Sequence, residues 1–300
     1  MFSSAGVYIA SLETGLILSI LAMGVVITYK ILDIADLSVE GTFPLGAFVF
    51  AALAVKGANP FIATAISLVI GAIAGFVTFL LYKKLKVAAI LSGILTMTML
   101  YSVNLRLTGR SNVPLFNSPS IFSELENINR VVVLILIVIM AKLILDYFFK
   151  TEKGYLLIVT GDNESLVKSL GKNPDRYTCI GLMISNGMVA LSGSLMAQYQ
   201  GFSDAQMGAT MIVTALASII IGDTFLKNNR KLKNTSRAII GAIAYKLMAG
   251  LAIELGLEPG DLKGITALIV IGFIAYNNAT IFGMDKIKRS GLLNKEGNNA

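Results

Sequence analysis

The 300-residue chain has no histidine, no tryptophan and a single cysteine, Cys179. A lone cysteine cannot form a disulfide within the chain, and without histidine the usual transition-metal ligand sets are missing. The absence of histidine also excludes imidazole acid–base catalysis. We therefore expect no catalytic residue, no metal site and no cofactor bound by this chain.

Charge is also scarce, because only 14% of the residues are charged and 55% are hydrophobic. Soluble domains carry about 25% charged residues. The apolar residues are grouped in runs close to the length of a bilayer crossing. The sequence thus predicts an all-α polytopic membrane protein, with residues 1–300 forming one transmembrane domain in contact with lipid. The net charge of +7 lies on no single basic, aromatic-interleaved face, which argues against nucleic-acid binding.

Hydropathy predicts nine transmembrane helices. They cover Leu12–Tyr29, Ser38–Val55, Pro60–Leu81, Ala88–Leu105, Val131–Phe149, Tyr177–Tyr199, Met207–Gly222, Ala238–Leu255 and Ile265–Ile281.

Lysine and arginine fix the predicted orientation, because cytoplasmic connections carry an excess of both. One set of connections holds Lys30, Lys83, Lys84, Lys86, most basic residues of 150–176 and 227–237, and those of the tail 284–300. The other set holds only Lys56, Arg106, Arg110, Arg130 and Lys263. The richer side is assigned to the cytoplasm, so the N-terminus is outside and the C-terminus inside. Residues 108–129 form the longest outer loop.

The cytoplasmic connection 151–176 contains a predicted two-turn helix, Asp162–Gly171. Asp162 is a suitable N-cap, and Gly171 suits the residue that follows a helix. Asn163, Glu164 and Lys168 are polar, whereas Leu166, Val167 and Leu170 share one apolar face. So short a helix is marginal alone in water, and its apolar face needs a partner.

Two predicted crossings are interrupted by polar and small residues. The second opens with Glu40, Gly41, Thr42 and Pro44, and the seventh follows Asp204, Gly208 and Thr210. The two crossings run in opposite senses in the predicted topology. Interrupted segments at matching places in two halves indicate inverted repeats with a pathway between them.

Polar residues within other crossings are also candidates. Thr98 and Asn104 belong to a polar stripe of the fourth crossing, which can line a pathway or bind helices together. Small residues of the sixth crossing predict close helix packing. Lys142 and Asp146 are spaced for a helical ion pair, and Lys246 is expected to face an interior cavity or a partner subunit.

Three function classes remain: the membrane subunit of an ATP-driven transporter, an ion-coupled secondary transporter, and a membrane-embedded enzyme. The chain lacks GxxxxGK[ST], so a separate subunit would have to hydrolyse ATP. No nucleophile or metal pattern supports an enzyme. Deep ionisable residues that would couple an ion gradient are few.

Five blocks of the sequence carry a resemblance to a known family, and they lie at Ile31–Ala47, Ser92–Phe116, Gly161–Pro174, Val213–Phe225 and Gly256–Ile271. In these blocks the chain resembles the permeases of bacterial ATP-binding-cassette importers of the branched-chain amino acid and ribose type. The second and last blocks are similar to a subgroup linked to aromatic amino acid uptake, tryptophan in particular.

The resemblance implies a permease subunit in the bacterial cytoplasmic membrane. Its partners would be a second permease copy, a cytoplasmic ATPase and an extracellular substrate-binding lipoprotein or binding protein. The helix Asp162–Gly171 would dock the ATPase, with Leu166, Val167 and Leu170 in its groove and Asn163, Glu164 and Lys168 at the rim. Glu40, Thr42, Thr98, Asn104, Asp204 and Thr210 would line the path. An amino acid is the expected cargo, with a sugar or nucleoside as the alternative.

Overall fold

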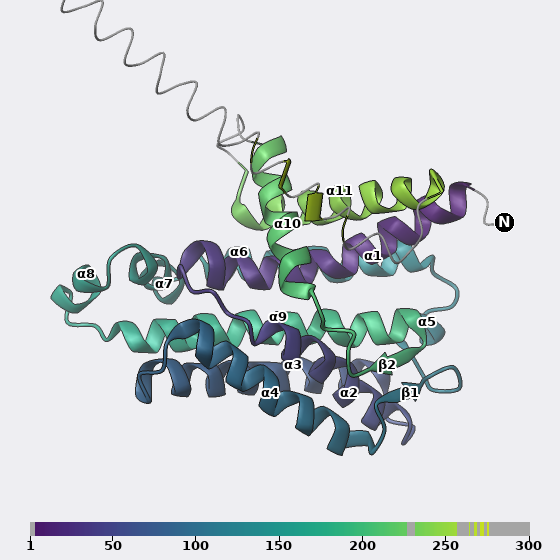
Figure 1. The fold of residues 1–300 in the computed structure, drawn as a ribbon, viewed down its shortest axis with the longest axis horizontal. Coiled ribbons are helices and arrows are strands. Elements are labelled where there is room, and N and C mark those ends of the chain that lie inside the picture. The colour runs from purple at the N-terminus through teal and green to yellow at the C-terminus, as the bar shows by residue number, and fades with distance from the viewer. Residues whose placement is uncertain are drawn as a thin grey trace, which may run out of the picture.

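The computed structural model of this chain describes residues 4–226 and 232–256, with the single positions 264, 267, 268, 271, 272 and 275 beyond them. It is an all-α membrane protein (Figure 1). The elements are α1 (Ser4–Val25), η1 (Val26–Ile31), α2 (Val39–Ala54), α3 (Pro60–Phe79), η2 (Leu80–Lys84), α4 (Ala89–Thr108), β1 (Asn112–Pro114), α5 (Ile121–Glu124), α6 (Arg130–Phe148), α7 (Glu152–Asp162), α8 (Glu164–Ser169), α9 (Pro174–Gln200), β2 (Phe202–Asp204), α10 (Met211–Phe225) and α11 (Asn234–Glu254), where η1 and η2 are π-helical continuations of α1 and α3.

Eight of the predicted crossings coincide with helices of the structure. Six of these helices, within the described residues, are long and apolar enough to cross a membrane. The other two, α2 and α10, are shorter apolar helices. The ninth predicted crossing and the tail 284–300 fall outside the described residues. Helix α7 was not predicted, because the connection 151–176 was expected to contain only the helix Asp162–Gly171.

The long helices run side by side, so that the molecule has two ends (Figure 1). Helices α7 and α8 lie at one end, called here the α8 end. The strands β1 and β2 and the short helix α5 lie at the other, called the β end. Since basic residues of the richer set, such as Lys30 and Lys83, lie beside α7–α8 or contact them, the α8 end is the one that the charge count assigns to the cytoplasm.

Helix α9 is the centre of the packing, with α1, α2 and α3 against it. Glycines allow the close approach, because a Cβ on Gly75 would overlap the carbonyl of Leu182, and one on Gly193 would overlap the carbonyl of Phe43. Ser192 adds a hydrogen bond to the carbonyl oxygen of Ile17 at 2.8 Å. The predicted close packing of this crossing is confirmed, and it follows the small-residue rule of membrane helices.

A second packing unit joins α1, α10 and α11. Gly222 of α10 and Gly241 of α11 face each other's helices so closely that a Cβ on either would overlap backbone carbonyls. Figure 1 shows α10 running steeply across the direction of the long helices. This crossing leaves α10 in contact with both α1 and α11 along its short length.

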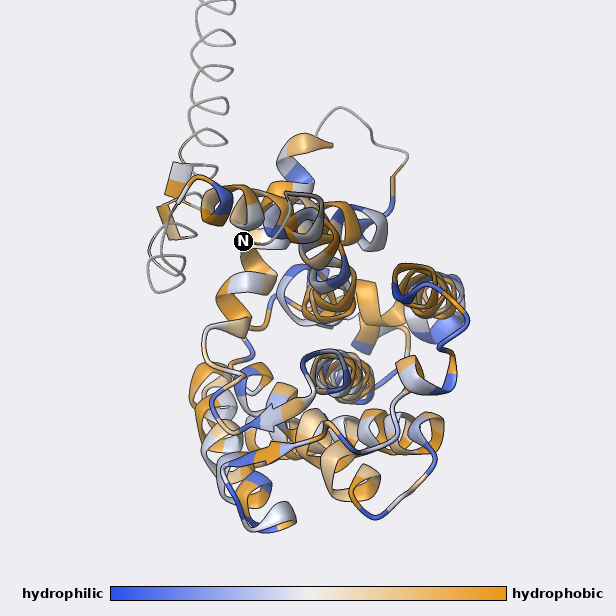
Figure 2. Ribbon diagram, turned by 90° about the vertical axis from the view of Figure 1, so that its right-hand side faces the viewer, coloured by the Kyte–Doolittle hydropathy of each residue, from blue (hydrophilic) through white to orange (hydrophobic). Residues whose placement is uncertain are grey.

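The outer faces of the bundle are apolar. Figure 2, which views the molecule from the β end, shows hydrophobic residues along most of its helices. Large side chains such as Leu136, Leu143 and Ile144 of α6 are about 60% exposed. Such a surface is stable in lipid and would aggregate in water.

Candidate translocation path and docking helix

Both short helices are too short to span a bilayer by themselves. Helix α2 has 16 residues and α10 has 15, which gives roughly 24 and 23 Å against a hydrocarbon core of about 30 Å. Non-helical backbone precedes each of them, residues 32–38 before α2 and residues 201–210 before α10. Such backbone is tolerated at membrane depth only where it is buried in protein or lines a cavity.

The connection before α2 reaches the middle of the molecule. Asn186, close to the midpoint of α9, donates from Nδ2 to Asp36 Oδ2 at 2.9 Å. The Ser38 N–H donates to Asp36 Oδ1 at 2.9 Å, and the Thr42 hydroxyl donates to Asn186 Oδ1 at 2.7 Å. All four side chains are at most 2% exposed. This network holds the first turn of α2 at mid-length of α9 and satisfies the buried carboxylate.

The segment before α10 arrives at the same place from the β end. Gly201 ends α9 with a φ of 76°, and β2 follows. Gly208 then packs so tightly on the first turn of α2 that a Cβ would overlap the Glu40 carbonyl. Thr210 has a φ of 68° and begins α10. Its N–H donates to Glu40 Oε1 at 3.1 Å.

The N-terminal ends of α2 and α10 therefore meet, with Glu40 between them. From this junction α2 runs toward the β end, where it packs on β1 and β2, whereas α10 runs steeply across the long helices and ends where Asp223 contacts Lys30 of η1. Two short helices whose N-terminal ends meet, each preceded by non-helical backbone, resemble the interrupted helices at the midplane sites of many transporters. A carboxylate is also favoured beside a helix N-terminus.

A groove of about 350 Å³ opens beside this junction. Helices α2 and α4 and residues 205–209 line it. The lining residues are Glu40, Gly41, Pro44, Met97, Thr98, Tyr101, Asn104, Ala205, Gln206 and Ala209.

The predicted path residues divide into three groups. Glu40, Thr98 and Asn104 line the groove. Thr210 does not line it, but its N–H holds the lining residue Glu40. Thr42 and Asp204 do not line it: Thr42 is fully buried in the Asn186 network, and Asp204 accepts hydrogen bonds from Asn112 and Gln206 beside the β1–β2 ladder.

Two polar lining residues were not predicted as path residues. Tyr101 lies within the polar stripe of α4, which was predicted either to line a pathway or to bind helices together, but Tyr101 itself was not among the predicted path residues. Gln206 follows Asp204 in a turn, and nothing in its local sequence distinguishes it. Both become path candidates only when the fold brings α4 and residues 205–209 together.

The predicted docking helix is present with shifted boundaries. Helix α8 covers Glu164–Ser169, and Asn163 is its N-cap, accepting from the Leu166 N–H at 3.1 Å. Asp162, the predicted N-cap, is instead the last residue of α7. Gly171 follows the helix with a φ of 70°, in the conformation predicted for it. Asp162 and Asn163 are both residue types that suit an N-cap. Because α7 extends through Asp162, the next residue, Asn163, caps α8.

The apolar face of α8 is also narrower than predicted. Leu166 and Leu170 are 48% and 57% exposed, whereas Val167 is fully buried in the main core. Val167 therefore anchors α8 to its own chain and is not free to contact a partner. Glu164 is half-buried and Lys168 is exposed.

One ion pair joins α8 to the transmembrane helices. Lys83 of η2 lies 2.6 Å from Glu164 and 4.0 Å from Asp175 at the start of α9. Since η2 continues α3, this pair connects α8 to the end of a long transmembrane helix.

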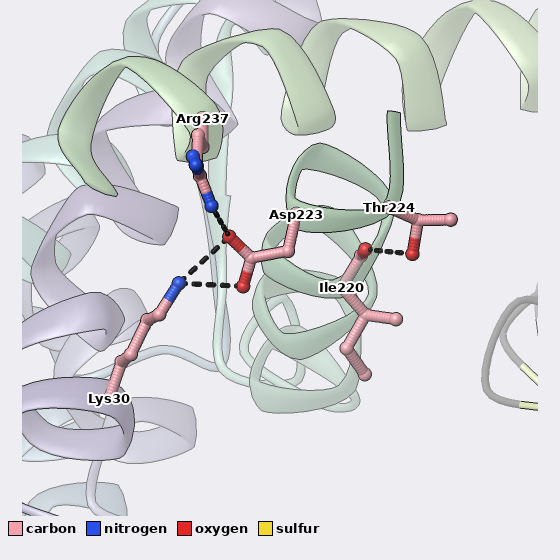
Figure 3. Close-up of polar contacts among 5 residues, drawn as sticks. All are labelled: Lys30, Ile220, Asp223, Thr224 and Arg237. Atoms are coloured by element: carbon pink, nitrogen blue, oxygen red, sulfur yellow. Dashed lines mark hydrogen bonds and ion pairs between the residues drawn. The ribbon is translucent and has the colours of Figure 1, made fainter. Parts of the chain in front are cut away.

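A second ion cluster lies where η1, α10 and α11 meet (Figure 3). Asp223 of α10 accepts from Lys30 at 2.7 Å and from Arg237 at 3.3 Å. Nearby, the predicted pair of Lys142 and Asp146 is confirmed at 2.7 Å. Asp146 also contacts Lys233 at 3.0 Å and accepts from the Thr235 hydroxyl at 2.7 Å, so α6 is joined to the start of α11.

Lys246 of α11 lies at the contact with α1, where its stem packs near Gly15. No ion pair to it is found in the part of the chain that the structure describes. It does not line the groove.

A family model described as the permease component of branched-chain amino acid transport systems matches residues 7–275. A tyrosine transport system permease protein of Clostridioides difficile is 45% identical over 273 residues, which cover 91% of this chain and 92% of the relative. An uncharacterized protein of Rickettsia prowazekii is 35% identical, with 88% and 95% covered. The autoinducer 2 import system permease protein LsrC of Salmonella typhimurium is 27% identical, with 87% and 75% covered.

Proposed function

The chain belongs to the family of branched-chain amino acid transport system permease components, and on this premise we propose that it forms the membrane path of an ATP-driven amino acid importer. A separate cytoplasmic ATPase docks on α8 and drives transport. The protein resides in the bacterial cytoplasmic membrane, with the α8 end in the cytoplasm. No catalytic chemistry takes place on this chain, and ATP is bound by the partner.

One observation carries the docking assignment: Leu166 and Leu170 are exposed on a short, well-capped helix at the basic end of the molecule. They lie on the surface of a segment that Val167 fastens to the core. A two-leucine face on a rigid helix suits helix-in-groove recognition by another protein.

Transport follows from the connections of this helix. ATP binding closes the two ATPase subunits and displaces α8 as a rigid body. The pair between Glu164 and Lys83 passes the displacement to η2 and α3. The junction of α2 and α10 then opens toward one side or the other, as in transporters whose sites lie between interrupted helices. Glu40, Thr98 and Asn104 face the cargo in the groove.

An aromatic amino acid is the proposed cargo. The support is the 45% identity to a relative named for tyrosine transport, together with Tyr101 in the groove lining. A different small solute is the second candidate, because relatives at 27% identity are named for autoinducer 2 import.

The remaining proposed partners are a second copy of this chain and an extracellular substrate-binding protein. The groove is bounded on one side by α4, whose outer face is largely exposed in the single chain. A second copy against this face would close the path from the lipid.

The docking assignment is tested by replacing both exposed leucines, Leu166→Asp and Leu170→Asp. Placing carboxylates in an apolar groove should weaken ATPase association by about 30-fold or more and abolish ATP-driven uptake in proteoliposomes. The double variant Ser165→Asp and Ser169→Asp is the matched control, since it adds the same two charges to other exposed positions of α8. Retained association and uptake in the double variant would refute the assignment.

An ion-coupled secondary transporter is tested separately. The chain alone in liposomes, without any ATPase, should not accumulate an amino acid under an imposed proton or sodium gradient. Accumulation under these conditions would replace the ATP-driven proposal with ion coupling.

A further inference from the structure

The described lining of the groove carries one negatively charged group and no positively charged one. Its polar lining consists of one carboxylate, two side-chain amides and two hydroxyls, and none of the described residues that line it is lysine or arginine. A carboxylate without a basic neighbour gives such a surface a preference for positively charged groups.

Asn104 supplies an acceptor that the protein leaves unused. The residue is fully buried, and its Nδ2 donates only a long hydrogen bond of 3.4 Å to the Gly41 carbonyl. Its Oδ1 has no partner among the described residues, although Asn104 lines the groove. Buried polar atoms are normally paired, and a donor on a ligand in the groove would satisfy this one.

Glu40 supplies a second acceptor, and its position is fixed. The Thr210 N–H holds Oε1 at 3.1 Å, while Oε2 has no hydrogen bond within the described structure. The residue is half-buried and lines the same groove as Asn104. A carboxylate anchored through one oxygen presents the other in a defined direction.

Tyr101 adds an aromatic surface to the same groove. The residue is 47% exposed and lies one helical turn before Asn104 on α4. An aromatic ring beside a cation site attracts both an ammonium group and the apolar part of a ligand.

We propose that this groove recognises the primary ammonium group of the cargo, with Glu40 and Asn104 as its acceptors. This inference rests on the proposed function and says which group of the cargo the groove binds. The described lining holds no basic residue, and the N–H at the start of α10 is already taken by Glu40, so this groove offers no partner for the carboxylate of an amino acid. The groove should therefore bind an amine as well as it binds the corresponding amino acid, and should reject the deaminated acid.

The experiment measures binding to the purified full-length chain by protection of a reporter cysteine. Cys179→Ser removes the native thiol, and Ala209→Cys places a reporter at an exposed residue of the groove lining. Ser165→Cys on α8 is the control reporter. The rate of maleimide labelling is measured with tyramine, tyrosine or 3-(4-hydroxyphenyl)propionate. Tyramine and tyrosine should slow labelling at residue 209 and leave labelling at residue 165 unchanged. 3-(4-Hydroxyphenyl)propionate should slow labelling at neither residue.

The assignment to Glu40 and Asn104 is tested in the same assay. Glu40→Gln should raise the tyramine concentration for half-protection by about tenfold, because a charge-assisted contact is lost. Glu40→Asp, which keeps the carboxylate, should protect better than Glu40→Gln. Asn104→Leu should also weaken protection, even with Glu40 intact. Equal protection by amine and acid, no protection at concentrations that saturate uptake, or unchanged protection in Glu40→Gln would each overturn the inference.

The assay also separates this inference from the proposed function. Amine protection without ATP-driven uptake by the complex would leave the ammonium site standing and refute the importer. ATP-driven uptake without amine protection would do the reverse.

Discussion

At the scale of single residues, the Asp36 network explains how non-helical backbone is stabilised deep in the molecule. Asp36 accepts hydrogen bonds from the Ser38 backbone and hydroxyl through one oxygen and from Asn186 through the other. A buried carboxylate is tolerated only when its acceptors are filled in this way. These side chains therefore determine that α2 begins deep in the molecule, beside the middle of α9.

This pairing predicts a specific exchange. Asp36→Asn directs an amide N–H₂ toward the amide of Asn186, and Asn186→Asp opposes two carboxylates. We expect each single change to lower the free energy of unfolding by about 2 kcal/mol or more. Combining the two changes restores one donor facing one acceptor, so the double variant should be more stable than either single variant.

Thermal unfolding in detergent, followed by circular dichroism because the chain has no tryptophan, measures this exchange. A double variant no more stable than the weaker single variant would contradict the described hydrogen bonds.

At the scale of elements, two contacts hold α8, the proposed docking helix, in place. Val167 binds it to the core, and Glu164 binds it to Lys83. The first is apolar and holds the helix against the bundle. The second is a partly exposed ion pair that contributes little to stability, about 1 kcal/mol or less.

We therefore expect Lys83→Met to reduce ATP-driven uptake severalfold while the ATPase still associates. Exchanging the charges, with Lys83→Glu and Glu164→Lys together, should recover uptake. Lys84→Met is the matched control, since Lys84 is exposed and makes no ion pair in the described structure. Unchanged uptake in Lys83→Met would show that force passes from α8 by another contact. Uptake kinetics and ATPase co-purification provide the two readouts.

The helices were largely predictable from the sequence, whereas the contacts between them were not. Apolar runs located eight crossings, and the acidic and glycine-rich openings of the second and seventh identified the interrupted pair. The contact of Glu40 with Thr210 joins residues 170 positions apart, and no local pattern encodes it. Likewise, the face of α8 was recognised, but the burial of Val167 depends on a core built from distant helices.

At the scale of the whole molecule, Asp223 links the crossings near the α8 end. It joins η1, α10 and α11 through Lys30 and Arg237 (Figure 3). These side chains are 17–30% exposed, so the cluster is partly shielded from solvent. Its removal should loosen α10 relative to both neighbours.

Asp223→Asn leaves two cations facing an uncharged amide. We expect a loss of about 1 kcal/mol in the free energy of unfolding and faster hydrogen exchange in the last turns of α10. Asp33→Asn serves as the control, because Asp33 is an exposed carboxylate near Lys30 in sequence with no ion pair among the described contacts. Slower or unchanged exchange in α10 would show that apolar packing alone fixes this helix.

The two-stranded ladder of β1 and β2 has a mechanical consequence. It pairs Asn112 with Asp204 and Pro114 with Phe202, so the loop 108–129 is joined to the segment 201–210 that leads into α10. The Ile121 N–H also donates to Gln198 of α9 at 2.9 Å, which anchors the far side of the same loop. We therefore expect a displacement of α10 to be transmitted to this loop at the β end. A protein bound at the β end would then respond to the position of α10 without contacting it.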